Sequence, residues 1–154
     1  GAWLQVAAER IGPSGRAVGL DLVAIDPLRL AQVSTVQGDV RTAAAITAIL
    51  NALGGPADVV LCDIAPKLTG IRVADESRRS ELLSGVLAAL STLLAPNGNL
   101  LIKLFMDTSY QATLGSLRGL FERVVSTRPD ATRPGSAELY VVATGFNQRP
   151  EIAC

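Results

Sequence analysis

The chain has 154 residues, of which 49% are hydrophobic, and its 14 basic side chains balance 14 acidic ones to a net charge of zero. This size and hydrophobicity suit one folded domain with its own core and exclude a disordered chain. The zero net charge excludes a general attraction to nucleic acid or anionic membranes, and the absence of histidine excludes histidine acid–base catalysis and most zinc sites.

Helix-like and strand-like segments alternate along the chain. Helices are expected at 2–10, 42–53, 77–94 and 108–121, and strands at 16–22, 33–37, 58–64, 99–105, 123–127 and 138–146. This alternation predicts an α/β fold with a mostly parallel sheet and helices on both faces. Because no helix separates the last two strands, the final strand is expected to be antiparallel.

Two further features bear on where the chain works. Cys62 and Cys154 are too few for a disulfide framework, which favours a reducing compartment, and no apolar run reaches the ~18 residues of a membrane span. We expect a monomer in the cytoplasm, or in an organelle such as the mitochondrion, with no metal site.

One lysine stands out because it lies inside an apolar strand. Lys103 interrupts the run 100–105, and the chain has two lysines against twelve arginines. A buried charge is costly unless it is paired or its pKa shifts, so this lysine needs a carboxylate partner or a function. Asp63 and Glu138 are the candidate partners.

The predicted topology brings charged residues to one edge of the sheet. Asp21 and Asp63 end strands, Asp39 follows another, Lys103 lies late in a fourth, and Glu138 opens the antiparallel last strand. Ligands of such sheets bind beyond the C-terminal ends of the parallel strands. We therefore expect these five residues to face one crevice.

Each of these residues also has an ordinary structural interpretation. Asp21 suits a turn as well as it suits a ribose-binding acid, and Asp39 alone is more typical of a turn or of the N-cap of the next helix. Glu138 alone suits a solvated strand start, and Trp3 alone suits the core. For Lys103 a functional role is favoured over a purely structural ion pair, because buried ion pairs are poor stabilisers.

Several sequence blocks, in their order and spacing, resemble the FtsJ/RrmJ family of S-adenosylmethionine-dependent RNA ribose 2′-O-methyltransferases. The blocks are Gly1-Ala2-Trp3-Leu4-Gln5-Val6, Asp21-Leu22, Gly38-Asp39, Asp63-Ile64-Ala65-Pro66, Lys103-Leu104-Phe105, Arg128-Pro129-Asp130 and 136–145. The resemblance covers nearly the whole chain. It implies a Rossmann-like methyltransferase sheet and S-adenosylmethionine as the cofactor.

The resemblance also implies roles for individual residues. For the cofactor, Gly1 and Trp3 lie by its methionine part, Asp21 with Leu22 holds its ribose, and Asp39 with Val40 lies at its adenine. Asp63 lies between the cofactor and the catalytic centre. Lys103 is the catalytic base, and Glu138 lies beside it.

The chain departs from the family pattern at its N-terminal end. The family's tetrad Lys-Asp-Lys-Glu begins with a lysine upstream of Gly1, and the central strand before the Gly-x-Trp turn is absent. We therefore expect residues 1–154 to be a single methyltransferase domain that lacks its N-terminal segment, with an interruption between the strands that end at Asp21 and Asp63. Lys67 stands where asparagine is common, which puts substrate contacts there in doubt.

The expected substrate is ribosomal RNA, as a uridine of the large ribosomal subunit. The candidate phosphate-binding residues are Lys67, Arg72, Arg128 and Arg133, although each arginine alone is more typical of a solvated surface. Transfer RNA or an mRNA cap are alternative substrates. A catalytically silent relative that binds RNA or protein is a second possibility, and a nicotinamide-dependent dehydrogenase has little support because no glycine fingerprint is visible.

Overall fold

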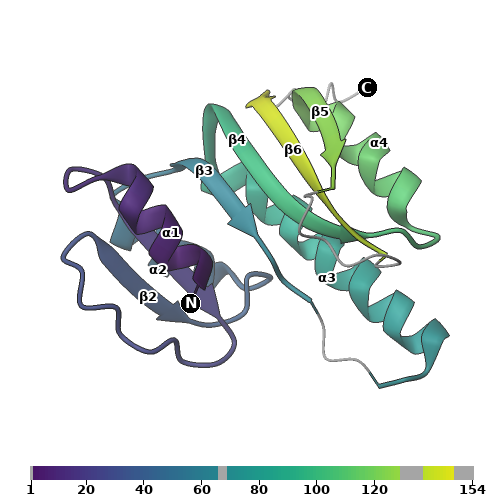
Figure 1. Ribbon diagram of the computed structural model, residues 1–154, viewed down its shortest axis with the longest axis horizontal. Coiled ribbons are helices and arrows are strands. Elements are labelled where there is room, and N and C mark those ends of the chain that lie inside the picture. The colour runs from purple at the N-terminus through teal and green to yellow at the C-terminus, as the bar shows by residue number, and fades with distance from the viewer. Residues whose placement is uncertain (1, 66–68, 129–136, 148–154) are drawn as a thin grey trace. The chain divides into compact units, whose positions relative to one another are not determined.

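The computed structural model describes residues 2–65, 69–128 and 137–147, and of Arg72 only the backbone. Its helices and strands follow the expected alternation (Figure 1). The helices are α1 (Ala2–Ile11), α2 (Ala43–Leu53), α3 (Arg72–Leu93) and α4 (Tyr110–Leu120). The strands are β1 (Ala17–Asp21), β2 (Val33–Gln37), β3 (Ala57–Cys62), β4 (Leu94–Phe105), β5 (Phe121–Thr127) and β6 (Glu138–Phe146).

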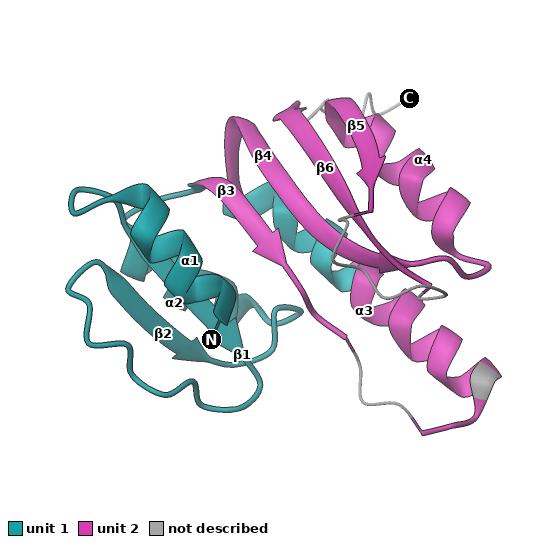
Figure 2. Ribbon diagram, viewed as in Figure 1, with its two compact units in different colours: residues 1–57, 85–93 teal, residues 58–84, 94–154 magenta. Residues whose placement is uncertain are grey.

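The chain divides into two compact units, residues 1–57 with 85–93 and residues 58–84 with 94–154 (Figure 2). The single domain expected from the sequence stays a prediction. The first unit holds the parallel pair β1–β2, in register from Ala17 opposite Val33 to Asp21 opposite Gln37. Both strands therefore end at the same edge.

Local signals in the sequence fix the ends of α2 in the first unit. Thr42 is its N-cap, and the Thr42 hydroxyl accepts a hydrogen bond of 3.3 Å from the Ala45 N–H. Gly54 closes the helix with a φ of 84°, a left-handed conformation that glycine adopts at little cost. Its N–H donates to the Leu50 carbonyl.

The second unit is built on a four-stranded sheet in the order β3–β4–β6–β5. Strand β6 runs antiparallel to both β4 and β5, whereas β3 and β4 run in the same direction (Figure 1). The predicted α/β class and the antiparallel last strand are therefore confirmed. Because β6 is reversed, its first residue lies at the edge where β3 and β4 end.

The core of the second unit follows from the alternation of side chains along β4 and β6. Leu100, Ile102 and Leu104 of β4 are buried, as are Leu139 and Val141 of β6. Full burial of one such side chain stabilises the fold by about 1.5–3 kcal/mol. Since successive side chains point to opposite faces, the residues between them, including Lys103, lie on the other face.

The described strands form two separate sheets. Strand β1 pairs with β2, strand β3 pairs with β4, and no pairing joins β1 to β3 in this part of the chain. No described helix is both long enough and apolar enough to cross a membrane.

Candidate active site

Lys103 lies on the half-exposed face of β4, and its side chain is 14% exposed. The antiparallel register places Tyr140 of β6 opposite Lys103 and places Glu138 opposite Phe105. Residues paired in this way lie on the same face of the sheet. Lys103 and Glu138 are therefore diagonal neighbours, which is close enough for a long side chain to bridge.

The structure brings the amine and both candidate carboxylates together. Lys103 Nζ forms an ion pair with Asp63 Oδ1 and lies 3.8 Å from Glu138 Oε1. Asp63 follows directly after the end of β3, and Glu138 is the first residue of β6. All three belong to the second unit, so their proximity depends on that unit alone.

The two carboxylates decide the charge of Lys103. Partial burial lowers the pKa of the Lys103 ammonium, but the hydrogen bond to Asp63 and the negative charges of Asp63 and Glu138 outweigh that effect. The pKa of Lys103 is therefore raised above its ordinary value of 10.5. The resting site contains an ammonium group, a point that the sequence left open.

Asp21, in the first unit, lies where it was expected, at the C-terminal end of β1. One of its oxygens accepts a hydrogen bond of 3.0 Å from the Val23 N–H, and the residue is exposed. Leu22 is 65% exposed. An exposed carboxylate offers acceptors to a pair of ribose hydroxyls, so this position fits the implied cofactor contact.

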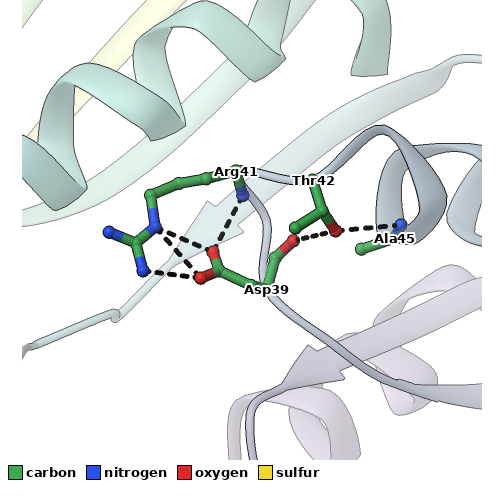
Figure 3. A network of polar contacts seen from close by, with 4 residues as sticks. All are labelled: Asp39, Arg41, Thr42 and Ala45. Atoms are coloured by element: carbon green, nitrogen blue, oxygen red, sulfur yellow. Dashed lines mark hydrogen bonds and ion pairs between the residues drawn. The ribbon is translucent and has the colours of Figure 1, made fainter.

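Asp39 follows the end of β2 and is held by Arg41 (Figure 3). Its Oδ1 accepts from the Arg41 backbone N–H at 2.9 Å, and its Oδ2 lies 2.6 Å from Arg41 Nη2. These bonds hold the pKa of the Asp39 carboxyl at about 2. Asp39 is thus a turn residue, while Thr42 caps the helix, and Val40 between them is buried.

Comparison with known proteins identifies the chain. The FtsJ-like methyltransferase family matches residues 1–146. The chain belongs to this family. This confirms the resemblance read from the sequence blocks and the expected enzyme class, a methyltransferase.

Two relatives of this FtsJ-like methyltransferase are named ribosomal RNA large subunit methyltransferase E. The protein from Methanosphaera stadtmanae is 40% identical over 95% of this chain and 72% of its own length. The protein from Methanococcus aeolicus is 36% identical over 95% of this chain and 54% of its own length. The chain thus spans about half to three quarters of the curated relatives it matches.

Solved structures agree on the fold. A ribosomal RNA methyltransferase from Plasmodium falciparum superposes with a TM-score of 0.81, at 22% identity, over 95% of this chain and 81% of its own. Human methyltransferase-like protein 13, solved in complex with SAH, gives a TM-score of 0.63 at 13% identity, over 99% of this chain and 69% of its own. The methyltransferase sheet predicted from the resemblance is therefore confirmed.

Other site residues that the sequence suggested in this FtsJ-like methyltransferase are placed only in part. Trp3 lies in the first turn of α1, and Arg128 follows β5, with its Nη2 3.8 Å from Met106 Sδ. The following candidates lie outside the described residues or have no described side chain: Gly1, Lys67, Arg72 and Arg133. Whether the five charged residues share one crevice stays a prediction.

The sequence did not identify Asp75, which orders the end of the loop after Asp63. This residue of α3 is 6% exposed, and its carboxylate accepts hydrogen bonds from Thr69 N–H, Thr69 Oγ1 and Gly70 N–H at 2.7–3.0 Å. The bonds from Thr69 lower the pKa of Asp75. An acid in the first turn of a helix, after Thr-Gly, was the available signal.

Proposed function

We propose that this FtsJ-like methyltransferase transfers a methyl group from S-adenosylmethionine to the 2′-hydroxyl of a ribose in ribosomal RNA. The observation that carries the proposal is the Lys103 ammonium held by Asp63 and Glu138 at the C-terminal edge of the sheet. The relatives named for the large ribosomal subunit support a uridine of that subunit as the target. A monomeric enzyme in the cytoplasm or in an organelle completes the proposal.

The cofactor residues are assigned by their chemistry and by the family resemblance. Asp21 accepts hydrogen bonds from the ribose hydroxyls of S-adenosylmethionine, and Asp39 accepts one from the adenine amino group. Leu22 and Val40 adjoin these acids, and Trp3, with Gly1, lies by the methionine part. The low pKa of Asp39 suits this role, because the carboxylate stays ionised and can only accept.

S-adenosylmethionine supplies an electrophilic methyl group on a sulfonium. Transfer breaks the carbon–sulfur bond, forms a carbon–oxygen bond, and releases the hydroxyl proton. The ribose oxygen must approach in line with the breaking bond at about 3–3.5 Å. The protein must therefore orient the 2′-oxygen and provide a group that accepts the hydroxyl proton.

A charged Lys103 performs this task as a hydrogen-bond donor. Its ammonium donates to the 2′-oxygen, fixes the direction of attack, and stabilises the negative charge that develops on the oxygen. Asp63 is the nearer carboxylate to Lys103 and accepts the hydroxyl proton. This assignment differs from the one implied by the family resemblance, in which Lys103 is the base, because here Asp63 takes the proton.

The test replaces Lys103 in the full-length protein. Lys103→Ala abolishes transfer of tritiated methyl groups to undermethylated large ribosomal subunits, while calorimetric titration finds the affinity for S-adenosylmethionine unchanged. Arg118→Ala, which removes an exposed cation from the last turn of α4, is the matched control and leaves both quantities unchanged. Near-normal turnover of Lys103→Ala removes Lys103 from the mechanism.

The same assay tests the alternative that the protein is a catalytically silent relative that only binds RNA or protein. Binding of large subunits without methyl transfer by the unaltered protein would support that alternative. The RNA contact is tested by raising the salt concentration, because phosphate contacts release counterions and their affinity falls with salt. An RNA affinity that does not change with salt would contradict phosphate binding by the candidate residues Lys67, Arg72, Arg128 and Arg133.

A further inference from the structure

A second charged cluster adjoins the reactive lysine within the same unit. The Arg79 guanidinium of α3 lies over the ring of Phe105, with its Cζ 5.3 Å from the ring centroid. Lys103 Nζ lies 6.0 Å from the same centroid. A cation near an aromatic face is attracted by the ring quadrupole, and the attraction grows as water is removed.

An acid in the turn after β4 holds Arg79. Asp107 Oδ1 accepts hydrogen bonds from the Ser109 N–H at 2.9 Å and from Ser109 Oγ at 2.7 Å. Its Oδ2 lies 3.3 Å from Arg79 Nε. Each oxygen therefore has its own partner, one on the turn and one on α3. The side chains of Arg79 and Asp107 are 20% and 12% exposed, so neither charge is well solvated.

The attraction between Arg79 and Asp107 depends on charge more than on hydrogen-bond geometry. Arg79 Nε is buried and makes no hydrogen bond to the described atoms, although it lies 3.3 Å from the carboxylate. A neutral isostere of Asp107 would keep an acceptor for Ser109 and lose the attraction for Arg79. Asp107→Asn therefore separates the two functions of this carboxylate.

We infer that the Arg79–Asp107 pair is a positioning device for Lys103 that acts through the Phe105 ring. The pair fixes the ring on the half-exposed face of the sheet, and the ring limits where the Lys103 ammonium can lie beside Asp63 and Glu138. Arg79 is neutralised by Asp107, so it is a positioning residue and not a phosphate contact. Loss of the pair loosens the ammonium without removing any group that touches the cofactor.

The lysine content of the chain makes a direct test practical. Residues 1–154 contain two lysines, Lys67 and Lys103, so few side-chain signals are expected from nitrogen-labelled lysine in an NMR spectrum, and the Lys103 signal is assigned by its loss in Lys103→Met. Asp107→Asn and Arg79→Ala shift or broaden the Lys103 signal and leave the Lys67 signal unchanged. Phe105→Leu moves it as well, because the ring is lost, whereas Phe105→Tyr preserves it.

The activity arm of the test rests on the proposed function and uses the full-length protein. In Asp107→Asn and Arg79→Ala, kcat for RNA methylation falls about tenfold, which corresponds to about 1.4 kcal/mol of transition-state stabilisation. The KM for RNA and the affinity for S-adenosylmethionine stay within about twofold, as expected for a change that acts on the transition state alone. Arg79→Lys, which keeps a cation over the ring, recovers part of the loss.

Two controls distinguish positioning from a general structural effect. Arg78→Ala removes an exposed cation one residue away on α3 and leaves both the Lys103 signal and kcat unchanged. The circular dichroism spectrum of Asp107→Asn matches that of the unaltered protein, which shows that this variant is folded. An unchanged Lys103 signal in folded Asp107→Asn overturns the inference. Failure of methylation by the unaltered protein contradicts the proposed function instead.

Discussion

Lys103 is predicted to act as an ammonium throughout the physiological pH range. Because the carboxylates raise its pKa above 10.5, pH 7.5 lies more than three units below it. At most about one molecule in a thousand then has a neutral amine, and forming that amine costs at least about 4 kcal/mol. A mechanism that needs neutral Lys103 would carry this cost in every turnover.

The perturbation that distinguishes the two mechanisms is Glu138→Gln. Glu138 Oε1 lies 3.8 Å from Lys103 Nζ, and the Glu138 side chain is 43% exposed. At that distance two unit charges attract by about 1 kcal/mol in water and about 4 kcal/mol at a dielectric of 20, and the exposure of Glu138 favours the lower figure. Glu138→Gln therefore lowers the pKa of Lys103, and Asp63→Asn, which removes the nearer negative charge, lowers it further.

The assay joins an NMR titration of the labelled lysines, with Lys67 as the internal reference, to the pH profile of kcat at saturating cofactor. For an ammonium that orients the hydroxyl, kcat does not rise tenfold per pH unit between pH 6 and 9, and Glu138→Gln does not increase it at pH 7.5. A tenfold rise per unit, together with a faster Glu138→Gln variant, would refute the reasoning, because both results require a neutral Lys103.

Two predictions concern stability. The Asp39 carboxyl has its pKa lowered from 3.8 to about 2, so its ion pair with Arg41 stabilises the fold above pH 3.8 and the contribution is lost as the pH falls toward 2. Asp39→Asn is therefore less stable at pH 7 by about 1 kcal/mol in urea unfolding, as for other exposed ion pairs, and a deficit that persisted at pH 2 would contradict this cause. Ile102→Ala, at a side chain 1% exposed, costs about 2–5 kcal/mol in the same measurement. Val73→Ala, at a residue 78% exposed, stays within about 0.5 kcal/mol, and similar losses at both sites would argue against the observed core.

The sequence predicted most elements because their periodicities are strong. The bounds of β2 and β6 agree with the predicted strands, and the turn signals after α2 ended that helix where expected. Helix α3 instead begins at Arg72, five residues before the predicted start at residue 77. The only large apolar side chain of its first turn, Val73, is exposed, so this turn has no buried apolar stripe. The bonds from Thr69 and Gly70 to the Asp75 carboxylate order it instead.

The site was predictable to the extent that it depends on strand ends. The positions of Asp63, Lys103 and Glu138 follow from topology, because the C-terminal ends of parallel strands and the start of an antiparallel one share an edge. The pair of Arg79 and Asp107 had no such signal. Arg79 lies on a helix and Asp107 in a turn, 28 residues apart in sequence. Neither position is at the end of a strand, so the strand pattern of the sequence gives no reason to expect them together.

The reversed direction of β6 has a consequence for how the enzyme tolerates change. A parallel strand of nine residues would carry its first residue to the far edge, roughly 27 Å from the last. In the observed sheet, Glu138 is located by its pairing with Phe105, and not by the connection that leads to it. Lengthening or shortening that connection therefore leaves the acid beside the amine, whereas a slip of one residue in the pairing would present Leu139 in its place.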